Sequence, residues 1–199
     1  MAWRGAYERA LPLVRESLAI AEEMDHLQWQ CGAARALGMI MLDLQAPRAA
    51  RELLERAHTI AQRLGSRTWT RWSAAPLAVA LGRLGEYREA HAALDAAAVR
   101  SAIGRDALRP EDENSPTLGQ RYLELARAEV ALEEGNPALA LEIANARLAA
   151  ESRAVPRLTF VRALALIGLD ELDQAERALH QAREESVTYE ARPILWRVQ

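Results

Sequence analysis

The chain of 199 residues has no lysine, one cysteine, few aromatic residues and no long hydrophobic run. The single cysteine, Cys31, excludes an internal disulfide, and its alanine-rich surroundings predict a packing role rather than a reactive thiol. No apolar run approaches the roughly 20 residues that cross a bilayer, and no basic N-terminal segment precedes a hydrophobic core. We therefore predict a cytoplasmic protein without a membrane segment.

Motifs for catalysis and metal binding are missing as well. The sequence has no glycine-rich phosphate loop and no nucleophile elbow. None of the four histidines pairs with another histidine, a cysteine or an acidic residue at a spacing expected for zinc. These histidines are His26, His58, His91 and His180. We predict a protein that is not an enzyme and that needs no metal or cofactor.

The distribution of charge argues against direct binding of nucleic acid. All 25 basic residues are arginines, and the net charge of the chain is −3. The arginines are spread along every amphipathic segment, whereas a nucleic-acid surface needs a concentrated basic stripe. We predict that most of them lie on solvated helix faces.

What the sequence does contain is a short motif that begins a helix and occurs five times. Each copy ends in alanine, and glycine at its start or proline at its third position suits a tight turn between two helices. Self-similarity at a period of roughly 20–50 residues is typical of a solenoid built from stacked helical units. The copies are GAYERA from Gly5, QAPRAA from Gln45, GEYREA from Gly85, GNPALA from Gly135 and DELDQA from Asp170.

A second helical segment precedes each of the last four copies. These segments cover residues 26–44, 67–84, 116–134 and 156–169, and each has a small residue seven positions before the turn. The small residues are Gly38, Ala78, Ala128 and Ala163. Each repeat is therefore predicted to be a helical hairpin whose two arms approach closely.

The pattern of these hairpins resembles the tetratricopeptide repeat. A Leu-Gly or Leu-Ala pair is followed after seven residues by Gly-x-Tyr, then by alanine and by a further small residue at Ala57, Ala97 or Ala182. The resemblance covers essentially the whole chain and is closest over residues 77–97. The longer period is similar to that of MalT-like and LuxR-type regulators and of bacterial signalling ATPases. The resemblance implies an all-α fold, a right-handed superhelical solenoid of antiparallel helix hairpins.

We expect one domain over residues 1–199, with about four full hairpins and an incomplete hairpin at each end. The chain is thus expected to be part of a longer protein, and its open end faces could pair two copies as a homodimer.

An acidic loop is predicted at residues 104–115, either as a tolerated insertion or as a site for a basic partner, followed by a helix capped by Ser115. Pro12 and Pro76 fall inside predicted helices and predict kinks, or, for Pro76, a late helix start.

The resemblance also implies a binding groove, because the first helices of tetratricopeptide hairpins line a concave surface. The chain is accordingly expected to be a scaffold that binds a peptide or helix, within a bacterial regulatory or signalling protein and next to its other domains. The alternative is a domain that senses a small effector. The implied groove residues are Arg35, Met39, Asp43, Trp72, Val79, Arg83, Tyr122, Leu125, Glu129, Phe160 and Leu164.

Overall fold

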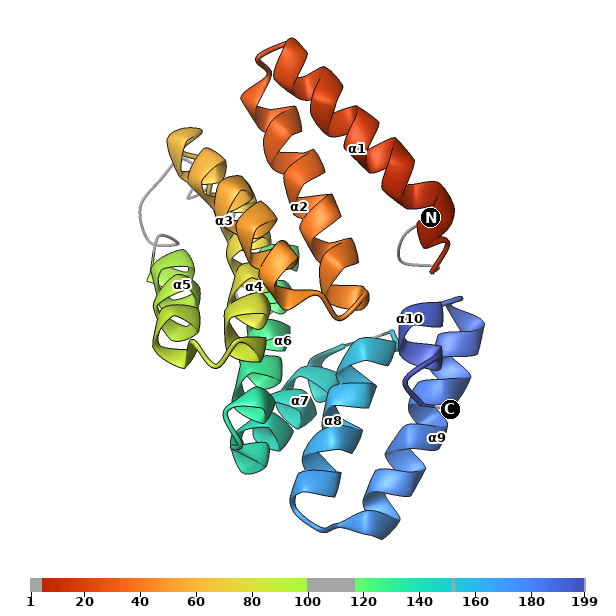
Figure 1. Ribbon diagram of the computed structural model, residues 1–199. Coiled ribbons are helices and arrows are strands. Elements are labelled where there is room, and N and C mark those ends of the chain that lie inside the picture. The colour runs from red at the N-terminus through yellow and green to blue at the C-terminus, as the bar shows by residue number, and fades with distance from the viewer. Residues whose placement is uncertain (1–4, 100–116, 152, 199) are drawn as a thin grey trace.

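The computed structural model describes residues 5–99, 117–151 and 153–198, and within these ranges the chain forms ten helices and no strand (Figure 1). The all-α prediction is therefore confirmed, while the loop predicted at residues 104–115 lies outside the described residues. The helices are α1 (Tyr7–Glu23), α2 (Leu27–Asp43), α3 (Pro47–Arg63), α4 (Arg67–Arg83), α5 (Tyr87–Val99), α6 (Leu118–Glu133), α7 (Pro137–Ala150), α8 (Pro156–Gly168), α9 (Leu172–Thr188) and α10 (Arg192–Leu195).

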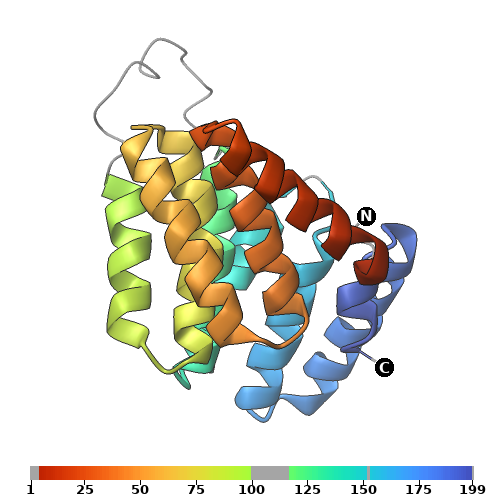
Figure 2. The ribbon, with the colours of Figure 1, turned by 45° about the horizontal axis from the view of Figure 1, so that its top comes forward.

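The helices pack in the order of the sequence, and α2/α3, α4/α5, α6/α7 and α8/α9 form the predicted hairpins (Figures 1 and 2). The first arms of the four hairpins begin and end within two residues of the predicted segments. In addition, α4 packs directly against α6, so that the first arms of successive hairpins touch each other. The core consequently runs from hairpin to hairpin.

One predicted helix start is wrong. Thr117, and not Ser115, caps α6, and it forms a capping box with Gln120. The Oγ1 of Thr117 accepts a hydrogen bond from the Gln120 amide at 3.3 Å, and the Gln120 side chain accepts one from the Thr117 amide at 2.7 Å. The capping box satisfies two otherwise unpaired amides at the helix start.

Most of the described turns between helices share one geometry, in which the residue after the helix cap is left-handed, whereas α7 ends at Glu151 in an extended conformation. At Gly85 the turn carries the pair of hydrogen bonds of a Schellman motif, from Gly85 to Gly82 and from Glu86 to Leu81, both at 2.9 Å. Gln45 adopts the same conformation, with a φ of 58°, although it has a side chain. The repeated motif therefore ends one helix and begins the next.

Replacing Gln45 with glycine should raise the free energy of unfolding by about 0.5–1 kcal/mol. A left-handed backbone disfavours a residue with a β-carbon by roughly 1–2 kcal/mol, and the chain entropy of glycine offsets part of this gain. Urea unfolding followed by circular dichroism measures the change. The matched control is Glu52→Gly at an exposed position of α3, which should lose about 1 kcal/mol. A loss of stability in Gln45→Gly equal to the loss in Glu52→Gly would contradict this account of the turn.

Both internal prolines lie within continuous helices. Pro12 stands in α1 and Pro76 in α4, and α4 begins at Arg67, so a late start at Pro76 is wrong. Because proline has no amide hydrogen, each removes one hydrogen bond from its helix. At Pro76 the carbonyl that loses its partner is that of Trp72, four residues earlier.

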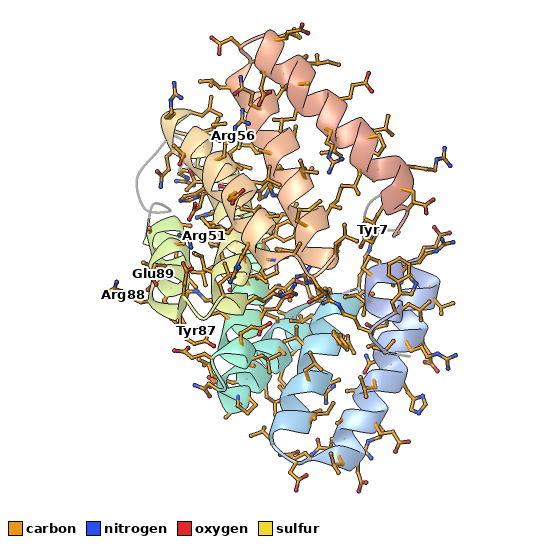
Figure 3. The ribbon with its side chains drawn as sticks, viewed as in Figure 1. Tyr7, Arg51, Arg56, Tyr87, Arg88 and Glu89 are labelled. Atoms are coloured by element: carbon orange, nitrogen blue, oxygen red, sulfur yellow. The ribbon has the colours of Figure 1, made fainter. Side chains whose placement is uncertain are left out.

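The two ends of the described chain meet. The start of α1 lies beside α10 (Figure 1), where Figure 3 labels Tyr7. The Tyr7 ring packs against Trp196, just after α10, with ring centroids 5.9 Å apart and the rings tilted by 59°. Gly5 packs into the same contact, where an added β-carbon would lie 3.0 Å from both Arg192 and Trp196. The row of helices thus curves far enough for its first and last members to touch.

Among the residues that the structure describes, no helix combines the length and the apolar character that a membrane span requires.

Candidate functional site

The predicted groove residues lie on the first arms of the hairpins, at four repeated positions. Counted back from the turn residue, these positions are −13, −10, −6 and −2. For example, Trp72 and Tyr122 both lie at −13, before Gly85 and Gly135 respectively. We call the surface that these positions form on α2, α4, α6 and α8 the inner face.

Two neighbouring cavities open on the inner face. The small cavity, of about 70 Å³, is bordered by six of the predicted residues. These are Arg35, Met39, Val79, Tyr122, Leu125 and Glu129. The large cavity, of about 730 Å³, is bordered by Arg83, Glu129, Phe160 and Leu164 from the predicted set. Nine of the eleven residues therefore border a cavity.

Their exposure differs, and this limits which of them a partner can reach. Val79 and Phe160 are buried, with exposed fractions of 3% and 7%, and they contribute to the core. Leu164 is 38% exposed at the edge of the large cavity. Leu164 is consequently the most accessible apolar side chain of the predicted set.

Arg35 is held at the centre of the inner face by three contacts. Its Nε donates a hydrogen bond of 2.7 Å to the Trp72 carbonyl, the one that Pro76 leaves without a helical partner. Its guanidinium lies 5.8 Å from the Trp72 ring centroid and 5.7 Å from that of Tyr122. Burial lowers the pKa of Arg35 from its ordinary value, and Tyr122 opposes this shift. Arg35 thus joins α2, α4 and α6, a structural role in addition to the predicted one.

Glu129 and Arg157 form an ion pair between the two cavities, and both residues border both of them. Arg157 donates from Nε to Oε1 and from Nη2 to Oε2, the latter at 2.8 Å. Burial opposes ionisation of Glu129, but the charges of Arg157, Arg83 and Arg197 outweigh it, so the pKa of Glu129 is lowered. The pair joins α6 to α8 and keeps a carboxylate ionised in a largely buried place.

Asp43, at the end of α2, acts on the contact between the chain ends. Burial and the negative charge of Asp43 raise the pKa of the Tyr7 hydroxyl, while the charges of Arg197 and Arg157 oppose this. The carboxylate of Asp43 also favours the charged form of Arg157. Although Asp43 borders neither cavity, it belongs to the same electrostatic cluster.

Sequence reasoning missed several residues of the inner face. Arg157 lies 13 residues before Asp170, and Glu133 lies two residues before Gly135, so both occupy the repeated positions. Applying the four positions to every hairpin would have found them. Arg197 also borders the large cavity, but it follows α10 and stands outside the register. Only the meeting of the chain ends brings it there.

Within the described ranges, no group of three or more histidine, cysteine, aspartate or glutamate side chains is placed to hold a metal ion. Cys31 is buried, and its thiol donates a hydrogen bond of 3.3 Å to the Ala57 carbonyl. Burial raises the pKa of Cys31 to about 11, so the thiol stays protonated near neutral pH.

The arrangement of the inner face suits binding: it offers fixed charges, aromatic rings and an apolar wall.

Comparison of the chain with protein-family models, with curated proteins and with solved structures found no match. The functional interpretation therefore depends on the residues and geometry described above.

Proposed function

We propose that the chain is a repeat scaffold of the tetratricopeptide kind, a right-handed superhelix that binds a peptide or a helix of another protein on its inner face. The observation that carries the proposal is the large cavity, because residues at equivalent positions of α4, α6 and α8 border it. Stacked helical repeats characteristically use such shared surfaces for recognition. A place beside other domains of a bacterial regulatory or signalling protein is part of the same proposal.

The composition of the large cavity supports recognition of a polypeptide. Phe160, Val161 and Leu164 form an apolar wall on α8, and Arg83 and Glu133 add opposite charges to the same cavity. Apolar anchors combined with a few fixed polar groups are the usual means by which grooves select a peptide or an amphipathic helix. Pairing of two copies through their end faces remains a prediction, and here Tyr7 of α1 already contacts Trp196, just after α10.

A selection from a random peptide library tests the proposal, with Leu164→Asp as the decisive variant. Leu164 is exposed at the cavity edge, so the new charge should remove binding of the selected peptides at least ten-fold while leaving the fold intact. Affinity is measured by fluorescence polarisation and folding by circular dichroism.

The matched control is Ile167→Asp. Ile167 lies on the same helix, α8, and is 45% exposed, but it does not border the large cavity. Its variant should bind the peptides as the original chain does. Failure of the library to yield any saturable binder, or equal loss in both variants, would refute the proposed scaffold.

Sensing of a small effector is the second candidate, and the size of the large cavity favours it. At about 730 Å³, this cavity falls within the range of roughly 300–1,000 Å³ that small-molecule sites occupy.

A further inference from the structure

Three arginines from distant parts of the chain meet at the large cavity. Arg83 comes from the end of α4, Arg157 from the start of α8, and Arg197 from the segment after α10. Burial lowers the pKa of Arg83, and the positive charges of Arg197 and Arg157 lower it further, while the carboxylates of Glu129 and Glu133 oppose the shift. Like charges are therefore held together, and an anion placed among them would relieve their repulsion.

The arginines retain hydrogen-bond donors after their contacts within the chain. A guanidinium has five N–H groups. Arg83 donates from Nη1 to the Leu42 carbonyl at 2.8 Å, and its Nε lies 3.6 Å from Glu133. The Nη2 of Arg197 is buried and has no hydrogen-bond partner among residues 5–99, 117–151 and 153–198. An unpaired buried donor of this kind is costly unless a ligand supplies an acceptor.

The charges that border the cavity sum to a positive excess. Two carboxylates, those of Glu129 and Glu133, stand against the three arginines. Glu129 is already engaged by both nitrogens that Arg157 directs at it. Asp43, the further carboxylate that acts on Arg157, does not border the cavity. The region between Arg83 and Arg197 is thus left to attract a negative group.

The cavity also has an apolar wall. Phe160 and Val161 are buried, and Leu164 extends this surface to the cavity edge. Pro137 and Leu132 complete it from α7 and α6. A ligand that fills the cavity therefore needs both a negative head and an apolar body.

We propose that the large cavity binds a small organic anion, with its carboxylate or phosphate between Arg83 and Arg197 and its apolar part on Phe160, Val161 and Leu164. The volume suits a small molecule, and Trp196, next to Arg197, is packed against Tyr7. Such a ligand joins the centre of the chain to its last segment and so stabilises the contact between the ends. The inference depends on the large cavity but not on peptide binding.

Titration calorimetry and thermal unfolding at low ionic strength test this inference with hexyl phosphate, hexanoate and neutral 1-hexanol as probes. Hexyl phosphate or hexanoate should bind saturably at one site and raise the unfolding temperature, and added salt should weaken the binding. The neutral alcohol should produce neither effect. Inorganic phosphate, which has the head without the apolar body, should bind more weakly than hexyl phosphate.

Arg197→Gln should weaken binding of the anionic probe about ten-fold or more, because a charged hydrogen bond is lost. Arg197→Lys, which keeps the charge, should retain most of the affinity and serves as the decisive comparison if the glutamine variant unfolds. The control is Arg88→Gln on α5, at a side chain that is 92% exposed, does not border the cavity and lies at the outer side of the molecule (Figure 3). This control should bind as the original chain does.

The proposal is overturned if neither anionic probe binds saturably, if the neutral alcohol binds equally well, or if Arg88→Gln and Arg197→Gln lose affinity alike. Binding of an acidic peptide without binding of either small anion would also overturn it, and would assign the arginines to a protein partner. The peptide test uses Leu164→Asp against Ile167→Asp, whereas the anion test uses Arg197→Gln. If the selected peptides still bind Arg197→Gln, failure of the anion proposal leaves the peptide proposal standing.

Discussion

Arg157→Met is expected to lower the free energy of unfolding by about 3 kcal/mol, the lower end of the range for a broken buried ion pair. The variant leaves the Glu129 carboxylate, whose side chain is 11% exposed, without the two hydrogen bonds that hold it. The estimate is at the lower end because Arg157 itself is 29% exposed and Arg83 remains near Glu129. Urea unfolding at neutral pH measures the loss.

The same loss should shrink in acid. In the original chain the pKa of Glu129 is lowered, so the stability it contributes is present above the ordinary glutamate pKa of about 4.3 and disappears as the pH falls through the folded value. In Arg157→Met, burial without a partner should raise the pKa of Glu129 instead, and protonation then relieves the penalty. The difference between the two proteins should therefore be smaller at about pH 4 than at pH 7.

Two comparisons establish that burial is the cause. Arg127→Met breaks the pair with Asp95, whose side chains are 39% and 69% exposed, and should change stability by less than about 1 kcal/mol. The double variant Glu129→Met/Arg157→Met removes both charges and should recover most of the stability lost in Arg157→Met. A double variant as unstable as the single one would show that the guanidinium matters for packing rather than for charge.

Gly38→Ala should destabilise the chain by about 2 kcal/mol, because the hairpin α2/α3 has no room for a methyl group. A β-carbon at this position would lie 2.6 Å from Cγ and 2.8 Å from Cδ2 of Leu54. Leu54 is fully buried, so it cannot move aside without disturbing the core. The better helix propensity of alanine, worth up to about 1 kcal/mol, offsets only part of the overlap. Thermal or urea unfolding measures the net change.

Gly32→Ala on the same helix provides a control of opposite sign. Its β-carbon would approach only the outer edge of the half-buried Trp69 ring, at 3.3 Å, so helix propensity should dominate and stability should stay equal or rise. A double-mutant cycle of Gly38→Ala with Leu54→Ala should give a combined loss well below the sum of the two single losses. Additive losses would place the strain somewhere other than at this contact.

The hairpins and their contacts could be predicted because they repeat. Each turn needs a helix stop, a helix start and a small residue within a few positions, and these local demands leave the same signature at Gly85 and at Gly135. The prediction at Ser115 was wrong because several capping residues stand together there, and only the observed bonds of Thr117 and Gln120 distinguish them. At Pro76 the sequence indicated a lost helical hydrogen bond but not its replacement by Arg35.

The sequence by itself therefore determined the all-α hairpins and the register that directs one side of each first arm toward the inner face. Helical periodicity is local, so a single sequence carries it. The tertiary structure alone decided how far the row of helices curves, and with it the contact of Tyr7 with Trp196 and the approach of Arg197 to Arg83. Curvature accumulates from small rotations between neighbouring hairpins, which depend on packing rather than on any local pattern.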